Sequence, residues 1–159
     1  MRQSILKPLA VSVALLLATT TTQATEMINA ENPEAILDIA KGFGSARLKK
    51  DREGDPMISG RIDGTKYGLY FYGCNDKGQK CDDVKFGAAW SGYKISIDTI
   101  NKWNKTKKYG VAYLDDDKDP NLDMMVNIDY GVSIDNLEDS FSIWAKILRS
   151  YKREVLGDK

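Results

Sequence analysis

The chain has 159 residues with 23 basic and 23 acidic side chains, and it contains no histidine. Removing a leader that carries Arg2 and Lys7 leaves 21 basic against 23 acidic residues, a net charge near −2. This balance argues against a nucleic-acid partner, which usually selects a strong basic excess. The lack of histidine excludes the usual catalytic triads and removes the commonest zinc ligand.

Residues 1–24 have the layout of a secretory signal peptide. A basic start is followed by an apolar run from Leu9 to Ala18 and by small residues that lead to a cleavage site after Ala24. The apolar run, about ten residues, is too short to span a bilayer. We therefore expect a periplasmic or secreted protein of a Gram-negative bacterium, with no membrane span after cleavage and a single domain over residues 25–159.

The first half of this domain predicts one helix followed by strands. Asn32 is a good N-cap and Pro33 suits the first helical position, while Gly42 or Gly44 ends the helix. Asp63-Gly64 indicates a tight hairpin. Short strand-like runs are found at residues 45–51, 57–62, 65–74 and 83–90.

The second half predicts a helix, a strand pair and a final helix. The first of these helices begins near Asp98, the expected N-cap, and ends before Gly110. Strands follow at residues 110–114 and 122–130, and Ser133 caps a helix with an apolar stripe. The order predicts an α+β fold: a single antiparallel sheet of about six strands, with three helices packed mainly on one face.

Two cysteines, Cys74 and Cys81, lie in a short segment with Gly78 between them. An even number of cysteines in an exported chain favours a structural disulfide that closes a hairpin loop. The alternatives are free thiols and a redox pair, although redox pairs use a two-residue spacing.

An aspartate-rich stretch, YLDDDKDPNLD, joins the last two expected strands. Asp115, Asp117 and Asp119 have the alternate spacing of a calcium loop. Pro120 and Val126, however, stand where an EF-hand needs Gly and Glu. A hairpin turn is the favoured interpretation, and weak surface calcium binding is the alternative.

Two groups of residues are candidates for a partner surface, each with core packing or plain solvation as the alternative. The first is aromatic, and alternation predicts that Tyr70 and Tyr72 share one face of their strand. The second is a run of lysines that suits an anionic partner. The candidates are Tyr67, Tyr70, Tyr72 and Trp90, with Lys102, Lys105, Lys107 and Lys108.

Three motifs occur along the domain: Gly-Asp-Pro at 54–56, Asn-x-Trp-Asn at 101–104 and Tyr-Leu-Asp-Asp-Asp at 113–117. Together they resemble the YbjN domain family of bacterial proteins, and the resemblance extends from about Met27 to Gly157. The family is described as sensory-transduction regulators. The resemblance implies a fold similar to that of type III secretion chaperones, which bind partner proteins and often form dimers.

The sequence therefore favours a non-catalytic protein- or peptide-binding regulatory module. We expect an unknown protein or peptide partner, with a homodimer as a further possibility, and no cofactor. One alternative is a carboxylate-based hydrolase acting on envelope glycans, since carboxylates are the remaining catalytic groups. The other is a calcium-stabilised binding domain.

Overall fold

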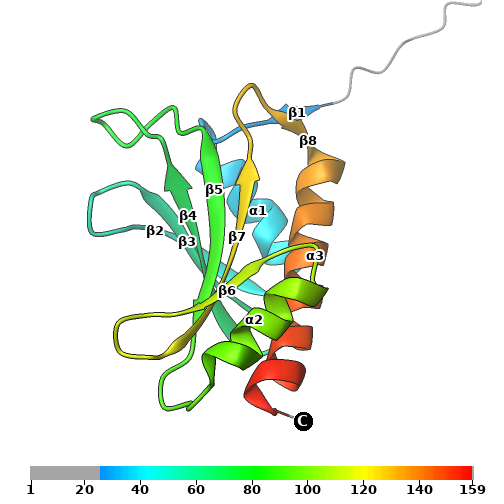
Figure 1. The fold of residues 1–159 in the computed structure, drawn as a ribbon. Helices are drawn as coiled ribbons and strands as arrows, with labels where there is room; N and C mark the ends of the chain where they lie inside the picture. Colours follow the sequence, from blue (N-terminus) through cyan, green and yellow to red (C-terminus); the bar gives the residue numbers. More distant parts are fainter. Residues whose placement is uncertain (1–25, 159) are drawn as a thin grey trace, which may run out of the picture.

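The computed structural model describes residues 26–158, so the predicted signal peptide at residues 1–24 lies outside the described residues. Figure 1 shows an α+β architecture in which a twisted sheet lies on one side of the molecule and helices lie on the other. Within residues 26–158, no helix combines the length and apolar character that crossing a bilayer requires.

The main sheet has six strands, and every neighbouring pair is antiparallel. Its spatial order is β2-β3-β4-β5-β7-β6, so β2 and β6 form the two edges. The strand bounds are β2 Ser45–Lys50, β3 Pro56–Ile62, β4 Thr65–Tyr72, β5 Asp83–Ala89, β6 Val111–Leu114 and β7 Pro120–Asn127. The Asp63-Gly64 hairpin is confirmed, since both residues have positive φ and pair Ile62 with Thr65.

The prediction of a single sheet was wrong in one respect, because a second sheet of two strands is present. Its strands are β1 (Met27–Ile28) and β8 (Val132–Ser133), which pair antiparallel. Each is only two residues long, and such a pairing leaves no alternation in the sequence for a pattern to reveal. The small sheet ties the start of the described chain to the residues that precede the last helix.

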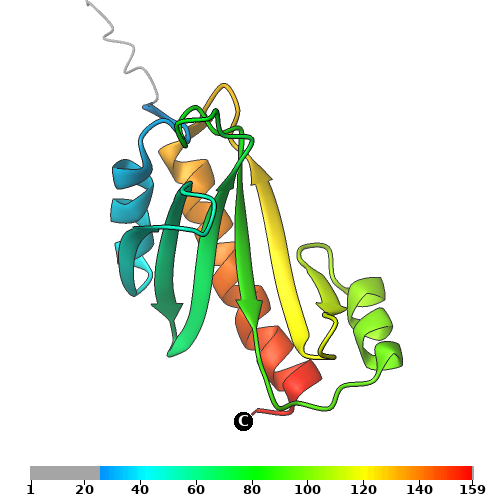
Figure 2. The same cartoon turned by 90° about the vertical axis from the view of Figure 1, so that its left-hand side faces the viewer.

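Helices α1 (Pro33–Gly42) and α3 (Ile134–Tyr151) cover one face of the main sheet, and α3 continues as the π-helical turn η1 (Lys152–Leu156). The expected N-caps are confirmed: the side chains of Asn32 and Ser133 accept backbone N–H bonds from Ala35 and Asn136. In Figure 2, α3 crosses behind the sheet, with α1 on one side of it and α2 on the other.

The core lies between α3 and the sheet and is rich in aromatic rings. Phe86 of β5 contacts Phe141 edge-to-face at 4.8 Å between ring centroids, and Trp144 at 5.4 Å. Phe43, just after α1, stacks on Phe141 at 5.3 Å. These contacts hold both helices on the same face, so the opposite face of the sheet carries no helix.

Helix α2 (Ile97–Thr106) lies along the edge strand β6 rather than over the sheet. Its N-cap is Ser96, not Asp98 as predicted. Ser96 has the extended backbone that an N-cap requires, and its hydroxyl accepts the N–H of Thr99. Asp98 lies inside the first turn instead, where its charge favours the helix N-terminus.

Candidate binding surface

The face of the main sheet that points away from the helices, called here the open face, consists of alternate residues of six strands. Along β4 these are Lys66, Gly68, Tyr70 and Tyr72, whereas the residues between them are buried. Tyr72 is 41% exposed, Tyr113 39% and Met125 55%. Helices cover only the other face, so aromatic and methionine side chains on this one lie in contact with solvent.

Tyr70 lies flat on the open face because two glycines make room for its ring. A Cβ added at Gly68 would lie 2.6 Å from Cε2 of Tyr70, and one added at Gly87 would lie 3.5 Å from the same atom. Gly68 and Gly87 are directly opposite each other in the β4–β5 pairing. The ring therefore covers backbone that would otherwise be bare, and it lies half-buried at the centre of the face.

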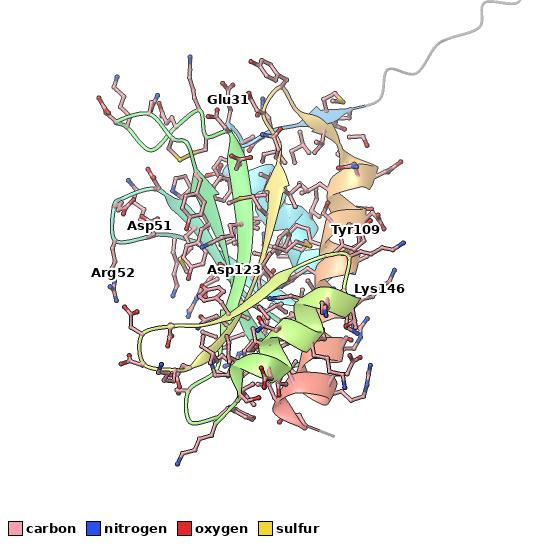
Figure 3. All side chains as sticks on the ribbon, viewed as in Figure 1. Glu31, Asp51, Arg52, Tyr109, Asp123 and Lys146 are labelled. Atoms are coloured by element: carbon pink, nitrogen blue, oxygen red, sulfur yellow. A yellow bond between two sulfur atoms is a disulfide. The ribbon has the colours of Figure 1, made fainter. Side chains whose placement is uncertain are left out.

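Lys85 and Asp123 form the charged centre of the open face, with the Lys85 Nζ 3.2 Å from Asp123 Oδ2. The same Nζ lies 5.2 Å from the Tyr72 ring centroid and 5.8 Å from that of Tyr70. Tyr113 donates its hydroxyl to Asp123 at 3.3 Å. Figure 3 shows Asp123 in the middle of the sheet. These contacts fix the rings in place.

The same contacts shift two pKa values. Partial burial on its own would lower the pKa of Lys85, but its contacts with Tyr72 and Asp123 outweigh burial and raise it. The pKa of Tyr113 is raised by partial burial and by the Asp123 carboxylate. Lys85 therefore stays charged and Tyr113 stays neutral at neutral pH.

A hollow of about 570 Å³ lies where Tyr70 and Tyr72 meet the β2–β3 loop. Met57 also lines it, opposite Tyr70 in the β3–β4 pairing. Phe71 lines it as well, and the remaining wall consists of charged residues of β2 and of the loop, among them Asp51 and Arg52, which Figure 3 labels. An apolar floor with a polar rim is typical of a site that accepts one apolar side chain of a ligand.

A second hollow, of about 240 Å³, lies on the same face over β2, β3 and β4. Arg47, Arg61 and Lys66 supply its charges, and Ser45 and Ser59 supply hydroxyls. No carboxylate lines it among the described residues. We call these three cations the basic half of the open face.

The aromatic candidates do not form one surface. Tyr70 and Tyr72 share the open face, as predicted from alternation. Tyr67 is only 4% exposed and belongs to the core, where its ring lies over Gly60 and 6.3 Å from Phe86. Burial raises its pKa to about 12. Tyr67 cannot contact a partner from this position.

Trp90 also packs inward, with its ring stacked on Tyr151 at 5.2 Å. Trp103 of α2 meets Tyr151 from another side at 5.1 Å, edge-to-face. Burial raises the pKa of Tyr151, whose hydroxyl is buried without a hydrogen-bond partner among the described residues. Trp90 and Trp103 of α2 therefore pack on the same ring of Tyr151. This position corresponds to the core-packing alternative for Trp90 rather than to a partner contact.

The four candidate lysines on and just after α2 also differ in position, since three are exposed and one packs against the fold. Lys102, Lys105 and Lys108 are exposed. Lys107 turns back onto the fold, where its Nζ lies 2.7 Å from Glu154 and 4.6 Å from the Trp103 ring centroid. Lys107 and Ser150 lower the pKa of Glu154 to about 2. Lys107 therefore joins α2 to the end of α3.

The second asparagine of the Asn-x-Trp-Asn motif protects a sheet edge. Asn104 Oδ1 accepts the N–H of Ala112 at 2.9 Å, and its Nδ2 donates to the Ala112 carbonyl at 3.0 Å. Ala112 belongs to the edge strand β6, so the side-chain amide pairs with the strand as a neighbouring peptide would. Trp103 of the same motif is buried.

The aspartate stretch forms a hairpin turn. Asp115 Oδ1 accepts the N–H groups of Asp117 and Asp119, and Oδ2 accepts from the side chain of Asn121. These bonds, led by the one from Asn121, lower the pKa of Asp115. Asp119 accepts the N–H of Gly92. In residues 26–158 no three acidic, cysteine or histidine side chains gather closely enough to hold a metal ion.

Two other hairpin loops have the same hydrogen-bond pattern as this turn at each position. In loops 51–55 and 75–79, as in 115–119, the first side chain accepts from the second and fourth following N–H groups. Its own N–H bonds the last carbonyl of the loop, and the fourth residue has positive φ. The aspartates are therefore explained by turn chemistry. The signal in the sequence was Asp or Asn followed three residues later by Gly, in two of the three loops.

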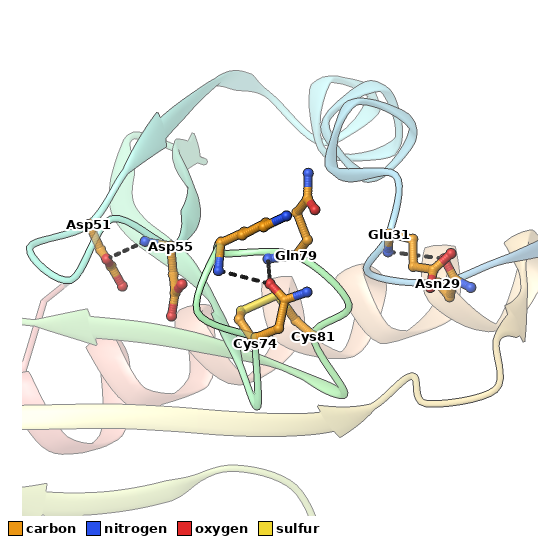
Figure 4. Close-up of a disulfide and its surroundings, with 9 residues drawn as sticks. Asn29, Glu31, Asp51, Asp55, Cys74, Gln79 and Cys81 are labelled. Atoms are coloured by element: carbon orange, nitrogen blue, oxygen red, sulfur yellow. Dashed lines mark hydrogen bonds between the residues drawn. A yellow bond between two sulfur atoms is a disulfide. The ribbon is translucent and has the colours of Figure 1, made fainter.

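Cys74 and Cys81 form a disulfide, so no cysteine is free. Figure 4 shows that it closes the β4–β5 loop beside the β2–β3 loop. The two loops touch: a Cβ added at Gly78 would lie 3.1 Å from Asp55 Oδ1 and 3.2 Å from the Gly54 carbonyl oxygen. The Gly-Asp-Pro motif thus lies at a loop–loop contact that borders the open face.

Two of the groups that catalytic sites often use are missing. Both cysteines are oxidised and histidine is absent, so the chain has no thiolate nucleophile and no imidazole base. Glu154 and Asp115 have lowered pKa values, the opposite of what a general acid needs. None of these observations favours the glycan-hydrolase alternative.

Comparison with known families gives a match that covers most of the chain. The sequence pattern of the YbjN family, described as "Putative bacterial sensory transduction regulator", matches residues 32–157. The chain belongs to the YbjN family. No curated protein and no solved structure matches the chain.

Membership in the YbjN family confirms the resemblance carried by the three motifs, and each motif has a structural role here. Gly-Asp-Pro forms a loop contact, Asn-x-Trp-Asn seats α2 and covers the β6 edge, and the aspartate motif forms a turn. The YbjN description names regulation and no reaction. The basic half was not predicted from the sequence, because its three cations lie on three different strands.

Proposed function

We propose that the chain is a non-catalytic YbjN module that acts after export, in the periplasm, by binding a protein or peptide through its open face. The family description, which names a regulator and no reaction, supports the regulatory part of this proposal. The predicted signal peptide and the disulfide support the oxidising compartment.

The open face carries the proposal. It presents two ordered tyrosines and a methionine around a fixed ion pair, next to a hollow of about 570 Å³. Tyrosine and methionine are enriched in protein interfaces, and tyrosine supplies contact area at low cost in conformational entropy. The rings are already held by Lys85, which lowers the ordering cost of binding.

Site-specific photo-crosslinking in living cells tests the proposal. A photoreactive amino acid replaces Tyr72 or Met125 on the open face, and the matched controls replace exposed Asp38 or Asn136 on the helices. We expect protein adducts of defined mass from the two open-face positions and none from the helix positions. Adducts from all four positions, or from none, would contradict a binding role for this face.

Cell fractionation tests the location in the same cells. We expect the cross-linked protein in the periplasmic fraction, with a mature N-terminus at Thr25 by mass spectrometry. A full-length chain retained in the cytoplasm would overturn the export part of the proposal and leave the open face to be judged by the crosslinks.

A further inference from the structure

The basic half contains an arrangement that weakens the sheet. Arg61 and Lys66 lie directly opposite each other in the β3–β4 pairing and point to the same face. Like charges in directly opposed positions destabilise a sheet. Arg47 approaches the same hollow from β2. The mutual repulsion of three cations around one hollow therefore destabilises the folded state, and a bound anionic ligand would relieve that repulsion.

The carboxylates of this face do not neutralise the basic half. Asp123 is engaged by Lys85 and Tyr113, and Asp83 accepts a bond from the Asn127 side chain. Arg61 reaches the Gly64 carbonyl, a neutral group. Among the described residues, none of the three cations of the basic half has an ion-pair partner. Their charge is free to attract a ligand.

The spacing between the two hollows suits an extended chain. Lys66 and Tyr70 are both on β4 and lie four residues apart, a distance of roughly 13 Å along a strand. An extended peptide covers the same distance in four residues, with the first and fifth side chains on one face. One ligand segment can therefore reach both hollows without a bend.

We propose that the open face binds an extended acidic segment of a partner protein. Its carboxylates contact Arg47, Arg61 and Lys66, and an apolar side chain four residues away enters the hollow beside Tyr70 and Tyr72. This inference rests on the proposed function, since it names the chemistry of the partner for the same face. A carboxylate suits the arginines because their planar guanidinium groups bond it through two parallel N–H groups.

Fluorescence anisotropy with a synthetic probe tests the pairing of charge and apolar contact. The probe is a labelled ten-residue peptide with Glu at three alternate positions and Leu four residues after the last Glu. One control peptide has Lys for Glu, and another has Ser for Leu. We expect binding of the probe that weakens with added salt, loss of binding with Lys, and several-fold weaker binding with Ser.

Two matched triple variants locate the site. Arg47→Glu/Arg61→Glu/Lys66→Glu reverses the basic half, and Lys102→Glu/Lys105→Glu/Lys108→Glu makes the same change in charge at exposed positions on and after α2. An exposed charge contact is worth a factor of about two to five. Reversing three should weaken the probe by roughly tenfold or more, while the α2 variant should bind within about twofold of wild type. Circular dichroism checks that both variants fold.

Three results would overturn the inference: equal weakening in both triple variants, equal binding of the Lys peptide, and equal competition by an inorganic polyphosphate of the same charge. Self-association of the protein on its basic half, seen by sedimentation and lost in the first variant, would assign the face to a second copy instead. Repeating the Tyr72 crosslinks in the first variant separates the two proposals. Unchanged crosslinks would reject the acidic segment and keep the binding face, whereas no crosslinks in wild type would reject the face itself.

Discussion

Replacing Asn104 by alanine should uncover the outer edge of β6. The substitution removes two hydrogen bonds to Ala112, at 2.9 and 3.0 Å, and leaves a strand N–H and C=O without their side-chain partner. A hydrogen bond of this kind contributes about 0.5–1.5 kcal/mol net, and water can reach part of this edge. We expect a loss of about 1–2 kcal/mol in the free energy of unfolding, which lowers the thermal midpoint by roughly 4–8 °C.

Asn101→Ala is the matched control. Asn101 is exposed on the same helix, and its side chain makes no hydrogen bond within the described residues. Both substitutions exchange asparagine for the better helix former, so the difference between the two variants isolates the edge pairing. Urea unfolding followed by tryptophan fluorescence gives both free energies on one scale.

A bare strand edge is also a template for pairing with another chain. Sedimentation velocity should therefore show more self-association for Asn104→Ala than for Asn101→Ala at equal concentration. If the two variants unfold within about 0.3 kcal/mol of each other and both stay monodisperse, the amide pairing makes no net contribution to stability, and the prediction is wrong.

Four further predictions concern stability. Tyr151→Phe removes a buried hydroxyl that has no partner among the described residues, so the unfolding free energy should rise by up to about 1 kcal/mol; a fall would indicate a hidden partner. Reduction of the Cys74–Cys81 bond, which closes a short loop, should cost about 2.5 kcal/mol in urea unfolding, and no change would refute the loop-entropy argument. Asp115→Asn keeps the Oδ1 acceptor of the turn, as Asn75 does, but its NH2 group cannot accept from Asn121, so it should lose about 1 kcal/mol of stability equally with calcium and with chelator, whereas a calcium-dependent midpoint in wild type would restore the metal alternative. The pKa of Glu154 is lowered from 4.5 to about 2, so its stabilising contribution is present above pH 4.5 and fades as pH falls toward 2; Glu154→Gln should flatten that part of the acid-unfolding curve, and an unchanged curve would contradict it.

Local signals in the sequence were enough to predict most elements of the fold. The caps at Asn32 and Ser133, the Asp63-Gly64 turn and the apolar stripe of α3 each depend on neighbouring residues, which a sequence displays directly. The small β1–β8 sheet depends on pairing over about a hundred residues, with two residues in each strand. No periodic pattern can mark so short a strand.

The candidate site was predicted only in part, because alternation gives the two faces of a strand but not which one is covered. Tyr67 and Tyr70 are both tyrosines three residues apart, and only the helices decide that Tyr67 is the buried one. Lys66 was the available signal in the sequence. Lys66, Gly68 and Tyr70 alternate along β4 and so share one face, and a lysine indicates that this face is in contact with solvent.

Part of the basic half could have been predicted from the sequence by working out the strand register that the Asp63-Gly64 turn imposes. A two-residue turn at Asp63-Gly64 pairs residue 62 with 65, and therefore Arg61 with Lys66. That register places Arg61 and Lys66 side by side on the same face, and the exposed residues of β4 show that this face is in contact with solvent. The contribution of Arg47 depends on the pairing across the longer β2–β3 loop, which the sequence alone does not fix.

The ring of Tyr70 over Gly68 has a consequence for how this family diverges. An alanine at position 68 would place its Cβ 2.6 Å from Cε2 of the ring, so the ring must leave its position over residue 68 or residue 70 must become small. The core repeats this arrangement, with Tyr67 covering Gly60 at the same 2.6 Å. We therefore expect positions 68 and 70, and positions 60 and 67, to covary in distant relatives. Each glycine and its tyrosine should be conserved together or replaced together, even where the rest of the sheet has diverged.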